Sequence, residues 1–497
     1  QITGGGSNFT VRFATASGAN LDRGYALAVV EQNSYLTPHS VSLASGDQQN
    51  LRSTSNAADL IVIGSYELLD AAQPLVEKRR DEGLRVAEVP ISEIFNQFGF
   101  GHTSSQAIKD FIKFAYDNWQ TPKAKYVLIL GDGTIDPKDQ LEYGLINGTQ
   151  PIPMEAGTYM DIASDNWYVA FDEESSIPQL AIGRLPTSSA AVVSQYVEKL
   201  IAYENGDRAP SADQAKKIFF INDKDTAQEG FSDKVSSMAS SMMSMKSDLV
   251  QTKIDRAQYS TDAAMKTDIT NAFNASPLLM TYLGHGAEDM WAHNDVFSAN
   301  DAANLTNSKL PIVVALDCLN AYYHTSDPTF ASIGEKMLFN ANGGAVAFWG
   351  STGMTAPSMQ LALSNAFFAE LAGETKKPTS DQRIGDFALR AKVILGSTPS
   401  TLDTLRSWTL LGDPSMKLPA SAFTPAVEPS PAAPSGQTSN SSTSGGKGKG
   451  GLFGCGTIQT PPAPPSGGAM TMALVLLLAP AGILLGIRRR LATQKAK

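Results

Sequence analysis

Cysteine is scarce in this chain, which contains Cys318 and Cys455 and no others among its 497 residues. Two cysteines in segments of very different composition argue against a disulfide framework. Histidine is also rare, with five in the whole chain, and neither a CxxC nor an HExxH pattern occurs, so the spacing typical of a zinc site is missing. Such low cysteine use is compatible with a secreted bacterial protein.

Positive charge is in the minority. Lys and Arg total 39 against 49 Asp and Glu, which gives a formal net charge of −10. Nucleic-acid phosphates are bound by clustered Lys and Arg on one face of a protein. Nucleic acid is therefore not expected as a partner, although the acidic balance identifies no substrate.

Two familiar loop motifs are incomplete. The stretch GDGTIDPKD, residues 131–139, spaces its acids like a calcium loop but lacks the glycine and terminal glutamate of an EF-hand. The glycine-rich loops lack the Lys-Ser/Thr that completes a phosphate-binding loop. We interpret residues 131–139 as a turn that follows a strand.

Long hydrophobic runs are missing except near the C-terminus. Residues 469–487 contain 19 residues without a charge, and Arg488–Arg490 follow. At about 1.5 Å per residue, this length just spans a bilayer core of roughly 30 Å. The arginines would place its C-terminal end inside the cell. We expect a transmembrane anchor or sorting segment over residues 469–490, with a buried core helix as the alternative.

Composition divides the rest of the chain into three parts. Residues 1–56 are rich in Gly, Ser, Thr and Asn with short strand-like pieces, and are interpreted as the end of a β-rich domain or a prosegment remnant. Residues 57–420 alternate apolar runs with amphipathic stretches. Residues 421–468 are rich in Pro, Ser and Gly, which predicts a disordered spacer.

The central part has the pattern of an α/β domain. In residues 103–119 the apolar positions follow helical spacing behind a Thr/Ser cap. Continuous apolar runs alternating with helices predict a mostly parallel sheet with helices on both faces. Polar residues end several runs, and we expect them to gather at the carboxyl edge of the sheet. The runs are LIVIGS (60–65), YVLILGDG (126–133), LAIGR (180–184), IFFIND (218–223), LLMTYLGHG (278–286), IVVALDC (312–318) and AVAFWGST (345–352).

Two successive runs end in groups that can perform covalent chemistry, His285 and Cys318. A thiol becomes a useful nucleophile when a nearby imidazole takes or balances its proton. The glycines beside His285 leave the Gly286 amide accessible, and this amide could hold an oxyanion together with the amide of Cys318. Each residue alone is commonly structural, as a small buried cysteine or a hydrogen-bonded histidine. The residues alone leave both interpretations open.

The motifs around these residues resemble the gingipain family of cysteine peptidases, within the caspase-like group. YLGHGAEDMW and VALDCLN are similar to the histidine and cysteine blocks of that family. LIVIGSYELLDAAQPLVEKRRDEGLRVAEV, YVLILGDGTIDP, SDNWYVAFDEESSIPQLAIGRLPT and SWTLLGDPSMKL look like further blocks in the same order. The resemblance covers residues 57–420 and implies a caspase-like α/β fold.

The resemblance also implies roles for individual residues. Cys318 would be the nucleophile and His285 the general base and acid, with Gly286 supplying an oxyanion amide. A third, acidic residue would follow the IFFIND strand, where Asp223 is the first candidate and Asp225 the second. The family residue is a glutamate, and an acid at a strand end is equally often a helix cap or a calcium ligand.

Specificity residues are less clearly matched. The family prefers a basic P1 residue, and Asp233 lies near the position of the acid that binds it. Trp291 matches a tryptophan after the histidine block, with ordinary packing as the alternative. The sequence GMTAPS after FWGST lacks the tryptophan of arginine-specific relatives, which puts an arginine preference in doubt. No cofactor is needed for the chemistry, and the resemblance allows a structural calcium ion.

The tail resembles bacterial C-terminal sorting signals. Cys455 in LFGCG, the spacer and the apolar segment suit processing for surface attachment, and a plain single-pass anchor is the alternative. We therefore expect an extracytoplasmic cysteine endopeptidase, anchored at or released from the cell surface, with protein or peptide substrates and a sorting machinery as partners. The alternative is an inactive gingipain-like surface or secretion-associated scaffold.

Overall fold

The computed structural model describes residues 49–419 and a short N-terminal hairpin. Within 49–419 the residues outside the description are 138–139, 143–149, 173–174, 247, 293–295, 326, 328 and 373–381. The hairpin pairs β1 (Ile2–Gly5) with β2 (Asn8–Val11). Cys455, the predicted spacer 421–468 and the predicted membrane segment 469–490 lie outside the described residues. No helix of the described part is long and apolar enough to cross a membrane.

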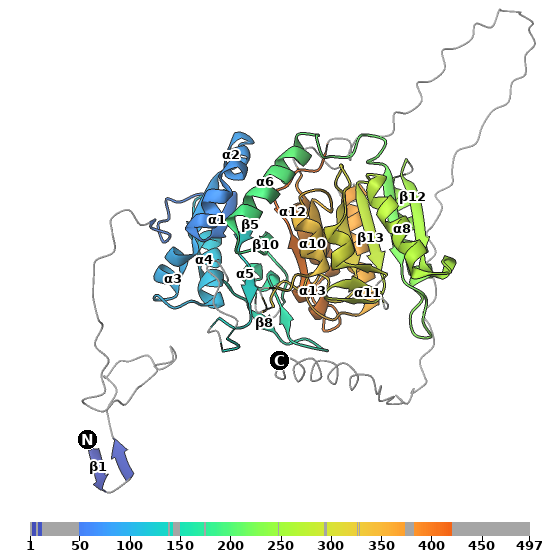
Figure 1. Cartoon of the computed structure of the whole chain (residues 1–497). Helices are drawn as coiled ribbons and strands as arrows, with labels where there is room; N and C mark the ends of the chain where they lie inside the picture. The colour runs from blue at the N-terminus through green and yellow to red at the C-terminus, as the bar shows by residue number, and fades with distance from the viewer. Residues whose placement is uncertain are drawn as a thin grey trace, which may run out of the picture. The chain divides into compact units, whose positions relative to one another are not determined.

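A ten-stranded sheet forms the centre of the domain (Figure 1). Its order is β12-β11-β13-β17-β18-β19-β10-β5-β3-β4. All seven apolar runs become strands of this sheet. The strands are β3 (Leu60–Gly64), β4 (Val86–Pro90), β5 (Tyr126–Leu130), β10 (Ala181–Leu185), β11 (Lys217–Asn222), β12 (Val250–Asp255), β13 (Leu279–Leu283), β17 (Ile312–Leu316), β18 (Ala347–Ser351) and β19 (Trp408–Leu411).

The sheet consists of two parallel halves that run in opposite directions. Every neighbouring pair is parallel except β18 with β19, which is antiparallel. The mostly parallel sheet is therefore confirmed. The expectation that all strand-end polar residues share one edge was wrong, because the strands of the two halves end at opposite edges. The loop from Gly131 that follows β5 thus starts at the edge opposite to the one where β13 and β17 end.

Helices cover both faces of the half that contains β3 and β5. Leu60 and Val62 pack in one apolar cluster with α1, α2 and α6, whereas Ile61 and Ile63 pack in a second cluster with α3 and α4. Alternate strand residues point to opposite faces, so the two clusters lie on the two sides of the sheet. These helices are α1 (Tyr66–Ala71), α2 (Gln73–Asp81), α3 (Ile91–Phe98), α4 (Ser105–Asn118) and α6 (Ala190–Glu204).

The predicted helix over 103–119 is confirmed as α4. Its first turn is capped by Ser104, whose side chain accepts a hydrogen bond from the Gln106 amide. Ala107, Ile108 and Phe111 point into the core, as their spacing predicts.

The remaining helices and several small strands complete the domain. α11 packs on α7, α12 and β17, and α10 packs on α9 and β18. The remaining helices are α5 (Asn166–Val169), α7 (Phe231–Met245), α8 (Asp262–Asn274), α9 (Ala299–Ala303), α10 (Ile333–Phe339), α11 (Pro357–Ala372), α12 (Ile384–Leu395) and α13 (Leu402–Ser407), with a 3₁₀ turn at Arg256–Gln258. The small strands are β6 (Gly133–Thr134), β7 (Gln150–Pro151), β8 (Met154–Glu155), β9 (Ile162–Ala163), β14 (Gly286–Ala287), β15 (Met290–Trp291) and β16 (Phe297–Ser298).

Candidate active site

Three neighbouring strands end together at one edge of the sheet. Leu283 of β13 is in register with Leu316 of β17 and with Asn222 of β11. His285 and Cys318 each follow their strand by two residues. Neighbouring strands lie about 4.8 Å apart, so this register brings an imidazole and a thiol from distant parts of the chain to the same rim.

The Cys318 side chain is partly buried in the turn that follows β17. Burial raises the pKa of its thiol to about 11, a backbone hydrogen bond at Thr355 opposes the rise, and the nearby Asp317 carboxylate adds to it. The thiol donates to the Thr355 carbonyl oxygen, with Sγ 3.9 Å from it. The sulfur is therefore a neutral thiol at pH 7 in this structure, and reaction requires a base to remove its proton.

Backbone geometry and a buried amide hold the Cys318 turn. Leu319 adopts a left-handed conformation with φ of 67°, which is uncommon for a residue with a side chain. Gln360 of α11 donates from Nε2 to the Asp317 carbonyl at 3.2 Å and to the Thr355 hydroxyl at 2.8 Å. Strained backbone of this kind persists where the surrounding structure enforces it.

His285 lies at the base of a hairpin formed by β14 and β15. Its carbonyl oxygen accepts hydrogen bonds from the Tyr282 hydroxyl and from the Ala292 amide, both at 2.7 Å. Its ring packs edge-on against Phe231, the first residue of α7, with centroids 5.3 Å apart. The residue is half-buried, so its backbone is fixed while the imidazole remains within reach of solvent.

Gly286 and Asp317 approach each other closely. A Cβ atom at position 286 would clash with the Asp317 carboxyl group and would lie 2.8 Å from the Cys318 carbonyl oxygen. Asp317 is fully buried, and neither of its carboxyl oxygens has a hydrogen-bond partner among the described residues. Burial raises the pKa of Asp317 well above its usual range. A carboxyl group whose protonated form is favoured by burial thus lies directly beside the two candidate residues.

Asp223 follows β11 at the same rim, but an arginine binds its carboxylate. Arg256 donates to Asp223 Oδ1 at 2.8 Å, and the Lys224 amide donates to the same oxygen at 2.7 Å. The second acidic candidate, Asp225, accepts a hydrogen bond from the Ser232 amide at the start of α7. The charge of Asp223 is largely balanced by Arg256, which also binds Asp262.

The two pocket candidates occupy different environments. Asp233 is exposed in the first turn of α7, two residues after Phe231. Trp291 is fully buried and stacks on Tyr282 at 4.7 Å, so its indole packs beneath the hairpin. A pocket role for either residue stays a prediction.

His324, one of the two histidines that flank the blocks, does not join the site. His324 is buried, and burial lowers the pKa of its ring to about 3, so it is a neutral core residue. His293 lies outside the described residues. No group of three or more His, Cys, Asp and Glu side chains that could hold a metal ion occurs within the described ranges.

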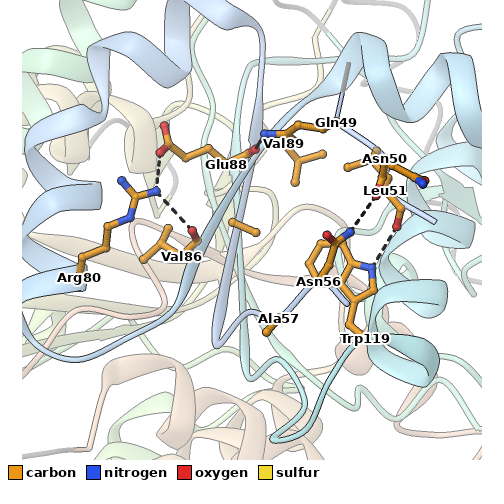
Figure 2. Close-up of a pocket in the computed structure, with 11 residues that line it drawn as sticks. Gln49, Asn50, Leu51, Asn56, Ala57, Arg80, Val86, Glu88, Val89 and Trp119 are labelled. Carbon is orange, nitrogen blue, oxygen red and sulfur yellow. Dashed lines mark hydrogen bonds and ion pairs between the residues drawn. The ribbon is translucent and has the colours of Figure 1, made fainter. Parts of the chain in front are cut away.

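A cavity of about 350 Å³ lies far from this rim in the sheet order, beside the edge strand β4 (Figure 2). Arg80 binds Glu88 at one side of it, and Asn56 donates to the Asn50 carbonyl at the other. β4 is the terminal strand of the half opposite to β13 and β17. The cavity therefore adds nothing to the Cys318 site.

Sequence reasoning missed three side chains at the rim: Asp317, Asn320 and Gln360. Asp317 and Asn320 stand in the quoted motif VALDCLN, but no spacing rule marks their roles. Gln360 lies in a helix, where a polar residue normally suggests a solvated face. Its full burial is visible only in the folded chain.

Comparison with known proteins places this arrangement in a family. Gingipain R2 of Porphyromonas gingivalis is 26% identical over 373 residues, covering 72% of this chain and 45% of that protein. Gingipain R1 of the same species is also 26% identical, and the match covers 34% of that protein. The chain thus spans less than half of these curated relatives.

Solved structures support the fold. The crystal structure of the Arg-specific cysteine proteinase gingipain R aligns with a TM-score of 0.58 and 20% identity, over 72% of this chain and 78% of that chain. A complex of the pro- and mature domains of RgpB from Porphyromonas gingivalis gives 0.57 and 19%, over 72% and 79%. The family model of peptidase family C25 matches residues 53–419, nearly the whole described domain, and the chain therefore belongs to that family.

Proposed function

We propose that this chain is a cysteine endopeptidase in which Cys318 is the nucleophile and His285 the general base and acid. The observation that carries the proposal is the register of β13 with β17, which sets both residues two positions beyond paired strand ends. Membership of a peptidase family supports the same assignment. The substrate class is protein or peptide.

The raised thiol pKa determines how the reaction would begin. A neutral Cys318 thiol has to lose its proton as Sγ attacks the peptide carbonyl, and His285 accepts that proton. The oxyanion would be stabilised by the amides of Gly286 and Cys318. His285 then gives the proton to the departing amine, and an acyl-enzyme on Sγ remains. Water, deprotonated by His285, hydrolyses the acyl-enzyme and restores the thiol.

Removal of the sulfur tests the proposal. Cys318→Ala in the full chain should abolish cleavage of fluorescein-labelled casein and leave the melting temperature within about 2 °C, because a partly buried thiol contributes little packing. His285→Ala should lower kcat by at least about 100-fold. Cys455→Ala is the matched cysteine control and should keep full activity. Cleavage retained in Cys318→Ala would end the proposal.

One observation favours a second function, a non-catalytic scaffold. A thiol with its pKa raised to about 11 is what an inert buried cysteine would have. A scaffold of this kind would show no casein cleavage in the wild type and no effect of His285→Ala on Cys318 alkylation. A peptidase gives the opposite result in both assays.

We further propose that Asp233 meets a basic P1 residue of the substrate. It is exposed on α7, next to the helix start that packs on His285. Digestion of a peptide library by the wild type and by Asp233→Asn, with and without calcium, tests this assignment. A library profile unchanged by Asp233→Asn would remove Asp233 from the pocket, and dependence on calcium would reveal a structural ion.

We also propose an extracytoplasmic location, with Cys455 and residues 469–490 as the anchoring or sorting signal. The proposal rests on the uncharged run of 19 residues before Arg488–Arg490. External protease treatment of intact cells producing the full chain should remove the domain. A chain protected from external protease would contradict the location.

A further inference from the structure

We infer that Asn320 is a positioning residue that fixes the His285 hairpin relative to Cys318. The inference rests on the proposed Cys318–His285 chemistry and adds a residue through which that chemistry is aligned. Asn320 lies two residues after Cys318 and is fully buried. Its side chain acts through the backbone of the hairpin.

The amide group of Asn320 binds both arms of the hairpin. Nδ2 donates to the Ala287 carbonyl of β14 at 2.6 Å and to the Met290 carbonyl of β15 at 3.3 Å. Ala287 is two residues after His285. One side chain from the cysteine turn therefore fixes the position of the strand pair that begins at the histidine.

Two backbone hydrogen bonds close the same unit. The Asn320 carbonyl accepts a hydrogen bond from the Gly334 amide at 3.1 Å. The neighbouring Ile333 amide donates to the Glu288 carbonyl of the hairpin at 2.9 Å. Both amides lie at the start of α10, where Ser332 and Glu335 form a capping box. The cysteine turn, the hairpin and the start of α10 are thus joined pairwise.

Geometry makes this amide hard to replace. A buried carbonyl that loses its donor keeps the cost of desolvation, so without Nδ2 the hairpin would move toward water or another donor. Aspartate has the same shape but would place an oxygen against two carbonyl oxygens. A shift of about 1 Å in a reacting group is enough to reduce a rate by roughly 100-fold.

The variants are Asn320→Ala and Asn320→Asp, with Asn307→Ala as the matched control. Asn307 is also buried, and its Nδ2 donates to two carbonyls, those of Lys309 and Gly344. It precedes β17, so it lies at the opposite end of that strand from Cys318. In the full chain, hydrogen–deuterium exchange of residues 286–292 should become at least tenfold faster in both Asn320 variants. It should be unchanged in Asn307→Ala.

Activity on labelled casein should separate positioning from general stability. We expect Asn320→Ala to lower kcat by 10- to 100-fold with KM changed less than threefold, and Asn307→Ala to leave kcat within twofold. In His285→Ala, the further change Asn320→Ala should cost less than twofold, since the residue that it positions is gone. Additive losses in that double variant would assign Asn320 a merely structural role and overturn the inference.

The exchange measurement does not depend on catalysis. If Cys318→Ala still cleaves casein, the proposed function fails while the exchange result still decides whether Asn320 holds the hairpin. If the hairpin exchanges at the wild-type rate in Asn320→Ala, the inference fails whatever the activity of Cys318.

Discussion

The carboxyl group of Asp317 occupies the space that a side chain at position 286 would fill, so the cysteine turn and the histidine hairpin meet there without a gap. The residue before the proposed nucleophile touches the residue after the proposed base. Changes on either side of this contact should therefore alter both the reaction rate and the stability of the protein.

Gly286→Ala tests the contact from the hairpin. The new methyl group would overlap the Asp317 carboxyl and lie 2.8 Å from the Cys318 carbonyl, so the hairpin must move away. We expect a loss of kcat of at least about tenfold and a stability loss of about 1–3 kcal/mol, typical of overpacking. Gly230→Ala is the control, because a Cβ there meets no atom within 4 Å. Equal kcat in the two variants would contradict this geometry.

Asp317→Asn tests the contact from the cysteine turn through pH. The folded-state pKa of Asp317 is raised, so the native protein keeps a proton that the unfolded chain releases above about pH 4. Wild-type stability should therefore fall as pH rises from about 4 toward the folded pKa, by at most about 1.4 kcal/mol per pH unit from this group. Asparagine cannot titrate, so the variant should gain in melting temperature relative to wild type as pH rises from about 4 toward the folded pKa of Asp317. Asp213→Asn, at an exposed carboxylate, is the control. A constant difference across pH would refute the buried, protonated acid.

The reactivity of Cys318 toward iodoacetamide should show its high pKa. In a Cys455→Ala background, with the pKa of Cys318 at about 11, only about one thiol in 10⁴ is ionised at pH 7. The alkylation rate should rise about tenfold per pH unit above pH 7, and the rise should shift to lower pH in Asp317→Asn, since that carboxylate contributes to the raised pKa. A plateau already present at pH 7 would indicate a resting thiolate–imidazolium pair instead.

Asp223→Asn distinguishes a third catalytic residue from an ion-pair partner. Because Arg256 binds the Asp223 carboxylate at 2.8 Å, we expect a stability loss of about 2 kcal/mol in urea unfolding and a kcat within tenfold of wild type. Asp262→Asn, which removes the other partner of Arg256, is the comparison. A kcat loss above 100-fold at unchanged stability would make Asp223 part of the catalytic group.

Much of the fold was accessible from sequence because most of the central strands are buried along their whole length. Runs such as residues 312–316 are apolar at every position, as expected of strands covered on both faces. The helix α4 was equally readable from Ser104 and its apolar spacing. His285 and Cys318 lie at the same edge of the sheet because each follows one of these buried strands, β13 and β17.

What the sequence could not supply depends on contacts between distant segments. β18 ends at Ser351 and β19 begins at Trp408, 57 residues later, and the two strands pair antiparallel. No local sequence pattern sets the direction of β19. Asn320 and Gln360 bind backbone carbonyls 30–43 residues away. Because every residue offers the same carbonyl, the partner of a buried amide leaves no trace in the sequence.

Because β18 and β19 are antiparallel, strands end at both edges of the sheet. Loops after β13 and β17 form the rim with Cys318, whereas the turns that follow β3 and β10 open onto the other. The loops that follow β3 and β10 therefore leave the sheet at a different edge from His285 and Cys318. A segment inserted after β3 would thus emerge at the edge away from the two reacting side chains.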